Sequence, residues 1–308
     1  MQDSSNFEIS RVCECLDVSV VALMLYEVTH ITRFNYEAPV SQCLNEVRLS
    51  PRDFSSQRVR ETRLDLDPSP AFLYERKDYF GNGVATFGVF DSHEKLTATA
   101  KSVVSVSPGR LGETSAPQGW KDVRDQIAAV EDDECLMASE FLYESPYVPL
   151  SPQLLAYAGE GFDGNRPLID VVLDLSQRIH RTFKYQPQST SIDIPLVEVL
   201  EKKRGVCQDF AHVMIGVLRS QRLAARYVSG YVRPGPQVQG AQASHAWVSV
   251  FFPGTGWLDF DPTNNVMPSE SHITLAWGRD YGDVTPVKGV TLGGRGQTIE
   301  VEVYVKPV

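Results

Sequence analysis

The segment RGVCQDFAHVMIGVLRSQ, residues 204–221, decides how the second half of this chain folds. Its apolar residues recur at the spacing of one helical face: Phe210, Val213, Met214, Val217 and Leu218. Ala211 and Ile215 add apolar surface outside this stripe, so the helix is predicted to be buried on more than one side. The pattern predicts a turn at Arg204-Gly205 and a helix from about Cys207 to Gln221.

Cys207 stands at the N-terminus of this predicted helix, where unpaired backbone N–H groups create a partial positive charge. A thiolate is stabilised at such a position, which makes Cys207 a candidate nucleophile. Gly205 allows the backbone to turn tightly before the helix. The alternative for a single cysteine is an inert, buried thiol.

Two further candidates follow on three predicted strands, at 226–232, 245–252 and 257–260. His245 opens the second strand, and Asp261 comes directly after the third. The Pro253-to-Gly256 turn joins these strands as an antiparallel pair, so His245 and Asp261 are expected at neighbouring strand ends. An imidazole there can take the thiol proton, and a carboxylate can hold its second nitrogen. We expect the Cys207 sulfur within about 4 Å of one ring nitrogen and an Asp261 oxygen at roughly 2.6–3.2 Å from the other.

Other polar residues near this set have weaker interpretations. The developing oxyanion needs donors, and the Cys207 N–H is the first candidate, with Tyr185 or Gln208 as a second. A core tyrosine and a surface amide are the alternatives for these two. Asp259 is a second acid, on the opposite strand face to Phe260. His212 lies about 140° around the helix from Cys207, so it is interpreted as a packing residue.

The first half of the chain reads as strands. Alternation of polar and apolar residues from Met24 to Tyr36 and the patterns at 84–90 and 96–106 predict a small all-β domain, interpreted as a sandwich, at 24–107. His30 lies on the apolar face and is expected to be structural. Residues 1–23 are predicted to be a poorly ordered extension, 108–120 a linker, and 121–308 an α+β catalytic domain. Helices are predicted at 132–143 and 167–184.

Composition excludes several classes of protein. The net charge is −10, from 29 basic and 39 acidic residues without a basic run, which argues against nucleic-acid binding. Five scattered cysteines, at positions 13, 15, 43, 135 and 207, indicate thiols in a reducing compartment. The apolar run Val20 to Leu25 is too short for a signal peptide or a membrane span. A cytoplasmic location is therefore expected, with no membrane partner.

Three segments in order, GVCQDFAH (205–212), SHAWVSVFFPGTGWLDFDPTN (244–264) and HITLAWGRDYGDVTPVKG (272–289), resemble the bacterial transglutaminase-like proteins. YEVTHITRFNYEAPV (26–40), VRLSPR (47–52) and DYFGN (78–82) resemble the N-terminal β-domain of that family. The resemblance implies a papain-like, transglutaminase-core fold behind a β-sandwich. It implies Cys207 as nucleophile, His245 as base and Asp261 as orienting acid. Arg279, Asp280 and Asp283 form a further family motif, interpreted as a salt-linked turn.

These observations favour an enzyme that forms a thioester with a peptide or protein amide and passes the acyl group to water. Transfer to an amine, as in a transglutaminase, is the first alternative, because the triad serves both outcomes. A non-catalytic binding module on the same scaffold is the second. A metalloenzyme with Cys207, His245 and Asp261 as ligands is the third, although no fourth ligand is evident. No cofactor is expected, since no nucleotide-binding glycine pattern occurs.

Overall fold

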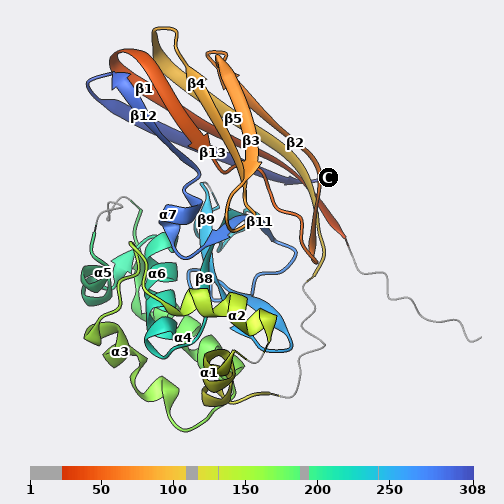
Figure 1. Cartoon of the computed structure of the whole chain (residues 1–308), viewed down its shortest axis with the longest axis vertical. Helices are drawn as coiled ribbons and strands as arrows, with labels where there is room; N and C mark the ends of the chain where they lie inside the picture. The colour runs from red at the N-terminus through yellow and green to blue at the C-terminus, as the bar shows by residue number, and fades with distance from the viewer. Residues whose placement is uncertain (1–22, 109–116, 131, 188–193, 242) are drawn as a thin grey trace, which may run out of the picture.

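The computed structural model describes residues 23–108, 117–130, 132–187, 194–241 and 243–308. Figure 1 shows a strand-rich part at the top of the view and a helix-rich part below it. The predicted extension 1–23 lies outside the described residues except for Leu23, and so does most of the predicted linker.

The strand-rich part is one seven-stranded antiparallel sheet built around a single long strand. Its members are β1 (Met24–Val47), β2 (Gln57–Asp67), β3 (Phe72–Lys77), β4 (Gly83–Val89), β5 (His93–Val106), β12 (Val287–Gly293) and β13 (Gln297–Pro307). The first part of β1 pairs with β5 and β13, and its last part pairs with β4 and β12. The register shifts between Asn35 and Val40, where the strand passes from one set of neighbours to the other.

This connectivity corrects the expected sandwich. The two sets of strands are not separate sheets, because β1 belongs to both of them. The sheet encloses its own small core, to which Phe34, Val40, Phe87 and Leu96 contribute. The first part of the chain is therefore a single curved sheet.

The last two strands come from the far end of the chain. Residues 287–307 were assigned above to the catalytic segment 121–308, but β12 and β13 pair with β1 along its otherwise open edge. An unpaired edge of a strand as long as β1 would leave a row of N–H and C=O groups without partners. The C-terminal strands supply those partners.

The second part packs helices on a four-stranded antiparallel sheet of order β10-β9-β8-β11. These strands are β8 (Ala225–Val232), β9 (His245–Phe252), β10 (Gly256–Phe260) and β11 (His272–Gly278), and a short parallel pair is β6 (Lys184–Tyr185) with β7 (Arg204–Gly205). The helices are α1 (Trp120–Ala129), α2 (Asp133–Ser139), η2 (Glu140–Leu142), α3 (Pro152–Ala158), η3 (Gly159–Phe162), α4 (Leu168–Thr182), α5 (Leu196–Lys202), α6 (Cys207–Ser220) and α7 (Tyr281–Val284). Helix α6 lies against β8 and β9 (Figure 1) and is buried along nearly its whole length, as its apolar pattern predicts.

Two side-chain amides join the first sheet region to the second sheet. Strand β11 is an edge strand, and Gln57 bonds both the N–H and the C=O of Thr274, at 2.8 Å each. Asn82 does the same for Trp277, at 3.0 and 2.9 Å. Each amide thus replaces a missing neighbouring strand, which protects the edge and fixes the two parts of the chain relative to one another.

A stack of cations and indoles lies beside these amides. The Arg52 guanidinium lies 3.5 Å from the Trp277 ring centroid, and the Arg226 guanidinium lies between Trp277 and Trp257, at 3.9 and 4.2 Å. Such contacts are stabilising where the cation is partly desolvated. Because Arg52 precedes β2 and the other three residues lie on the second sheet, the stack holds the same interface.

His30 also joins the two parts. Its Nδ1 bonds the Tyr231 hydroxyl at 2.9 Å, and its Nε2 bonds Thr32 Oγ1 at 3.0 Å. Burial lowers the pKa of His30 to about 4, so the ring is neutral at physiological pH. The structural role predicted for His30 is confirmed.

Among the helices of the described ranges, none has both the length and the apolar character that crossing a bilayer requires.

Candidate active site

The backbone before α6 positions Cys207. Gly205 pairs with Tyr185 in the parallel β6–β7 ladder, and its C=O accepts the Gln186 N–H at 2.8 Å. Asp209 then reaches back from the first turn of α6, and its Oδ2 accepts the Val206 N–H at 2.7 Å. This bond satisfies an N–H that the helix leaves free. Cys207 is the first residue of the helix and is buried, with 8% of its surface exposed.

Gly205→Ala is expected to destabilise this helix start. A Cβ at position 205 would lie 2.3 Å from Asp209 Oδ2 and 2.7 Å from Asp209 Cβ, so the cap must move. Losing a helix cap costs about 1–2 kcal/mol. Urea denaturation measures the change, and Gly161→Ala is the matched control because its nearest neighbouring atoms lie 3.9 Å away. Equal stabilities for the two variants would contradict the prediction.

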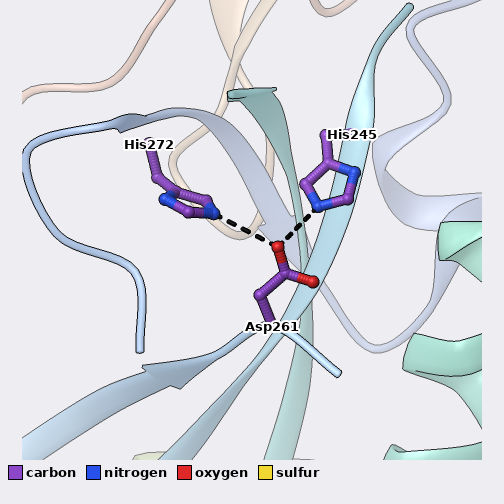
Figure 2. A group of neighbouring side chains, drawn as sticks. All are labelled: His245, Asp261 and His272. Atoms are coloured by element: carbon purple, nitrogen blue, oxygen red, sulfur yellow. Dashed lines mark hydrogen bonds and ion pairs between the residues drawn. The ribbon is translucent and has the colours of Figure 1, made fainter. Parts of the chain in front are cut away.

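His245 and Asp261 meet at the ends of β9 and β10. His245 Nε2 and Asp261 Oδ2 are 2.8 Å apart, within the range predicted from the sequence, and both side chains are buried. Figure 2 shows the imidazole beside the carboxylate, with its other nitrogen directed away from Asp261. That nitrogen, Nδ1, is buried and makes no hydrogen bond of standard geometry with the residues described.

The electrostatics connect Cys207 to this pair. Burial opposes the protonation of His245, but Asp261, and after it the Cys207 side chain, raise the pKa of His245 to about 10. Since Nε2 is bonded to Asp261, Nδ1 is the nitrogen left for the thiol. Burial acts to raise the pKa of Asp261, but His245 and then His272 hold it well below its usual range. The arrangement stabilises a positive charge on the imidazole between Asp261 and the Cys207 side chain.

This pKa shift predicts a pH-dependent stability. The folded pKa of His245 lies above its unfolded value of about 6.5, so its contribution is complete below that pH and is lost as pH rises through about 10. The stability advantage of the wild type over His245→Gln should therefore shrink between pH 6.5 and 10. Urea denaturation of both proteins across that range measures it. An advantage that stays constant or grows would refute the assignment.

Asp261 has more partners than the sequence suggested. Its Oδ1 accepts the backbone N–H groups of Thr263 and Asn264, at 2.9 and 3.1 Å. Its Oδ2 accepts Asn264 Nδ2 at 2.8 Å and lies 3.3 Å from His272 Nε2 (Figure 2). Neither Asn264 nor His272 was predicted from the sequence as a site residue. The turn sequence after Asp261 signals the two backbone donors, whereas His272 arrives from the separate strand β11.

Tyr185 and Gln208 are placed differently from each other. Tyr185 is half-buried and lines a cavity of about 600 Å³. Burial, and after it Cys207 and Asp261, raise the pKa of Tyr185 to about 12, so its hydroxyl remains a donor at neutral pH. Gln208 lines a separate, smaller cavity of about 250 Å³. The two oxyanion candidates therefore line different cavities, and Cys207 contributes to the raised pKa of Tyr185.

The remaining polar residues have structural partners. Asp259 accepts the Trp247 indole N–H at 2.9 Å. His212 accepts the Tyr281 N–H at 3.2 Å, and burial, then Arg219, lower the pKa of His212 to about 3. These bonds agree with the packing role expected for His212.

The Arg279 motif is a salt-linked turn, as predicted. Arg279 donates two bonds to the Asp283 carboxylate, at 2.9 and 3.0 Å. Asp280 is buried and accepts the N–H groups of Gly282 and Tyr147, at 2.8 Å each. The buried Arg219 guanidinium donates to the Arg279 carbonyl at 2.6 Å, which ties α6 to this turn.

His245, Asp261 and His272 are close enough to be considered as ligands of one metal ion. Whether they suit a cation depends on the hydrogen-bond donors that surround them. The three ligand atoms lie within 4.8 Å of one another. The Asn264 amide NH₂, however, lies 2.8 Å from Asp261 Oδ2 and 3.3 Å from His245 Nε2. Its orientation is fixed because its oxygen accepts the Gln239 N–H at 2.8 Å. A donor aimed at the centre of the cluster suits a hydrogen-bonded carboxylate and opposes a cation.

Two regions of the chain match models of known protein families. Residues 26–105 match the bacterial transglutaminase-like N-terminal region, and residues 156–262 match the transglutaminase-like superfamily. "Uncharacterized protein Rv2569c" of Mycobacterium tuberculosis is 37% identical, over 92% of this chain and 92% of its own length. Protein-glutamine gamma-glutamyltransferase of Pseudomonas aeruginosa is 32% identical over 129 residues, which are 38% of this chain and 19% of that protein.

A solved structure shares the fold of nearly the whole chain. It is described as "a Putative Cysteine Protease" from Cytophaga hutchinsonii, and it superposes with a TM-score of 0.74 at 18% identity. The superposition covers 93% of this chain and 91% of that chain. At this identity the likeness shows the arrangement of both parts of the chain.

Proposed function

The chain belongs to the transglutaminase-like superfamily, and we propose that it is a thiol-dependent acyl-transfer enzyme that hydrolyses amide bonds of peptides or proteins. The observation that carries the proposal is the bond between the buried side chains of His245 and Asp261. This bond uses Nε2 of the imidazole, so Nδ1 is available to the thiol of Cys207, which stands at the start of α6. The solved structure described as "a Putative Cysteine Protease" shares the fold on which these residues lie.

The proposed reaction has two steps. His245 Nδ1 takes the proton of Cys207, and the sulfur attacks the amide carbonyl to form a C–S bond. The backbone N–H of Cys207 and the Tyr185 hydroxyl are the proposed donors to the oxyanion. The C–N bond then breaks, and the leaving amine takes the proton from the imidazolium. Water attacks the thioester, gives its proton to His245 and releases the acid, and the thiol is restored.

Amine transfer is the second candidate. It is favoured by the similarity to the protein-glutamine gamma-glutamyltransferase of Pseudomonas aeruginosa. In that reaction an amine replaces water in the second step, so the same three side chains serve it. Hydrolysis is preferred because amine transfer needs a second binding site that excludes water.

Intact-mass spectrometry with amide substrate libraries, with and without primary amines, tests the proposal. We expect a mass increase on Cys207 equal to the acyl group, followed by release of the free acid. A product that carries the added amine would show that the enzyme transfers the acyl group to an amine and not to water. If no amide formed an adduct, both reactions would be rejected, and a non-catalytic binding module would be the remaining alternative.

Cys207 should be the most reactive thiol of the folded protein near neutral pH. Cys43, Cys135 and Cys207 are all buried, but of these three only Cys207 combines a helix N-terminus with an adjacent imidazole. Iodoacetamide labelling over a short time course, mapped by peptide mass, measures the order. Faster labelling of Cys43 or Cys135 would count against the nucleophile assignment.

A further inference from the structure

The 600 Å³ cavity beside Tyr185 has an unusual wall. On one side it is lined by the loop around Val238 and Gly240, and on the other by four consecutive residues of β13, Val301 to Tyr304. Successive side chains of a strand point to opposite faces of its sheet. Four residues in a row can therefore line one cavity only along the backbone edge of the strand.

The hydrogen-bond register shows which groups of β13 face the cavity. The Val308 N–H donates to the Leu25 C=O at 2.9 Å, within the same register that pairs β13 with β1. In an antiparallel ladder bonded pairs alternate, so even-numbered residues of β13 bond β1 and odd-numbered residues point the other way. Val301 and Val303 thus direct their N–H and C=O groups outward. Within the described residues β1 is the strand that pairs with β13, which leaves this edge open.

The open edge lies next to the candidate active site. Gly240 lines the same cavity, and a Cβ added there would lie 2.5 Å from His245 Nδ1. Tyr185 also lines it, and its pKa responds to Cys207. One cavity therefore connects the unpaired edge of β13 with the groups around the thiol.

We propose that this edge binds the substrate as an added antiparallel or parallel strand, so that the substrate is an extended polypeptide segment. The inference rests on the proposed function and names its substrate class. Four strand residues span about 13 Å, which corresponds to a segment of about four substrate residues. The wall is mostly apolar, and its charged side chain, Glu302, is already paired with Arg33. A neutral or basic segment with small or apolar side chains fits this chemistry.

The test compares peptide reagents with a small reagent on the same thiol. The peptide probes are N-chloroacetyl tetrapeptides and tetrapeptidyl chloromethyl ketones of Ala, Val, Ser and Lys, which present an electrophile at either end. Iodoacetamide is the reference for thiol reactivity. Val301→Pro removes an outward N–H without removing a bond to β1, since proline is tolerated at strand edges. Ile299→Pro is the matched control, because Ile299 has the same parity and is exposed but does not line the cavity.

The ratio of peptide labelling to iodoacetamide labelling at Cys207 should fall about three- to tenfold in Val301→Pro and much less in Ile299→Pro. N-methylation along the peptide should slow labelling at alternate positions. Equal ratios in both variants, or no alternation, would overturn the proposal.

A second measurement separates this inference from the proposed function. Hydrogen exchange on Cys207→Ala protein with the tetrapeptide pool needs no reactive thiol. Slower exchange at Val301 and Val303 supports strand addition even if Cys207 proves inert, and unchanged exchange at both residues refutes it even if Cys207 is catalytic.

Discussion

Cys207→Ala is expected to abolish thioester formation and to lower kcat/KM for amide substrates by a factor on the order of 10⁴ or more. The reason is that the sulfur forms the covalent bond in the proposed reaction, and the other groups act through it. The side chain is small and stands at the start of α6, where the backbone is held by Asp209 and by the β6–β7 pair, so the fold should persist. Intact mass and steady-state rates measure the two effects.

Cys135→Ala is the matched control for this loss. Cys135 is also buried but lies on α2 and has no part in the proposed reaction. The control should keep its rate within a few-fold of the wild type. Activity of Cys207→Ala within tenfold of the wild type would mean that the chemistry does not use this sulfur.

Local patterns in the sequence predicted the elements that carry the site. The apolar spacing predicted a helix at 207–221, and α6 runs over Cys207–Ser220. The strand predicted at 245–252 is β9, with the same bounds. The helix predicted at 167–184 is α4, over Leu168–Thr182. Helical and strand periodicity are properties of a short window, so they are visible without knowledge of the partner.

The pairing of distant strands could not be predicted in the same way. Alternation predicted a strand from Met24, but β1 continues to Val47 and bends between two sets of neighbours. Its partner β13 begins at Gln297, more than 250 residues later. Periodicity shows which face of a strand is buried, but it does not identify the strand that completes an edge.

The candidate site shows the same division. Cys207, His245 and Asp261 could be proposed because each stands at the end of a predicted element, where side chains from different elements meet. His272 and Asn264 could not, because their bonds to Asp261 depend on where β11 and the turn after β10 come together. The resemblance to the family supplied the roles, and the structure supplies the hydrogen-bond partners.

Asp261→Asn is expected to lower kcat by about 10⁴ while the protein stays folded. Two backbone N–H groups, of Thr263 and Asn264, point at Oδ1, so the amide oxygen of the variant must occupy that position. Its NH₂ then faces His245 Nε2. A neutral imidazole must accept that bond and carry its proton on Nδ1, where it cannot take the proton of Cys207.

Asp259→Asn is the control for Asp261→Asn, because Asp259 is the neighbouring acid on β10 and bonds Trp247 instead of His245. It should keep its rate within about tenfold of the wild type. Asp261→Ala should be no milder than Asp261→Asn, since it leaves His245 and several buried donors without an acceptor. Rates measured alongside circular dichroism separate chemistry from unfolding. If folded Asp261→Asn kept more than a tenth of the wild-type rate, the carboxylate would not be needed to set the tautomer of His245, and the triad would reduce to a thiol–imidazole pair.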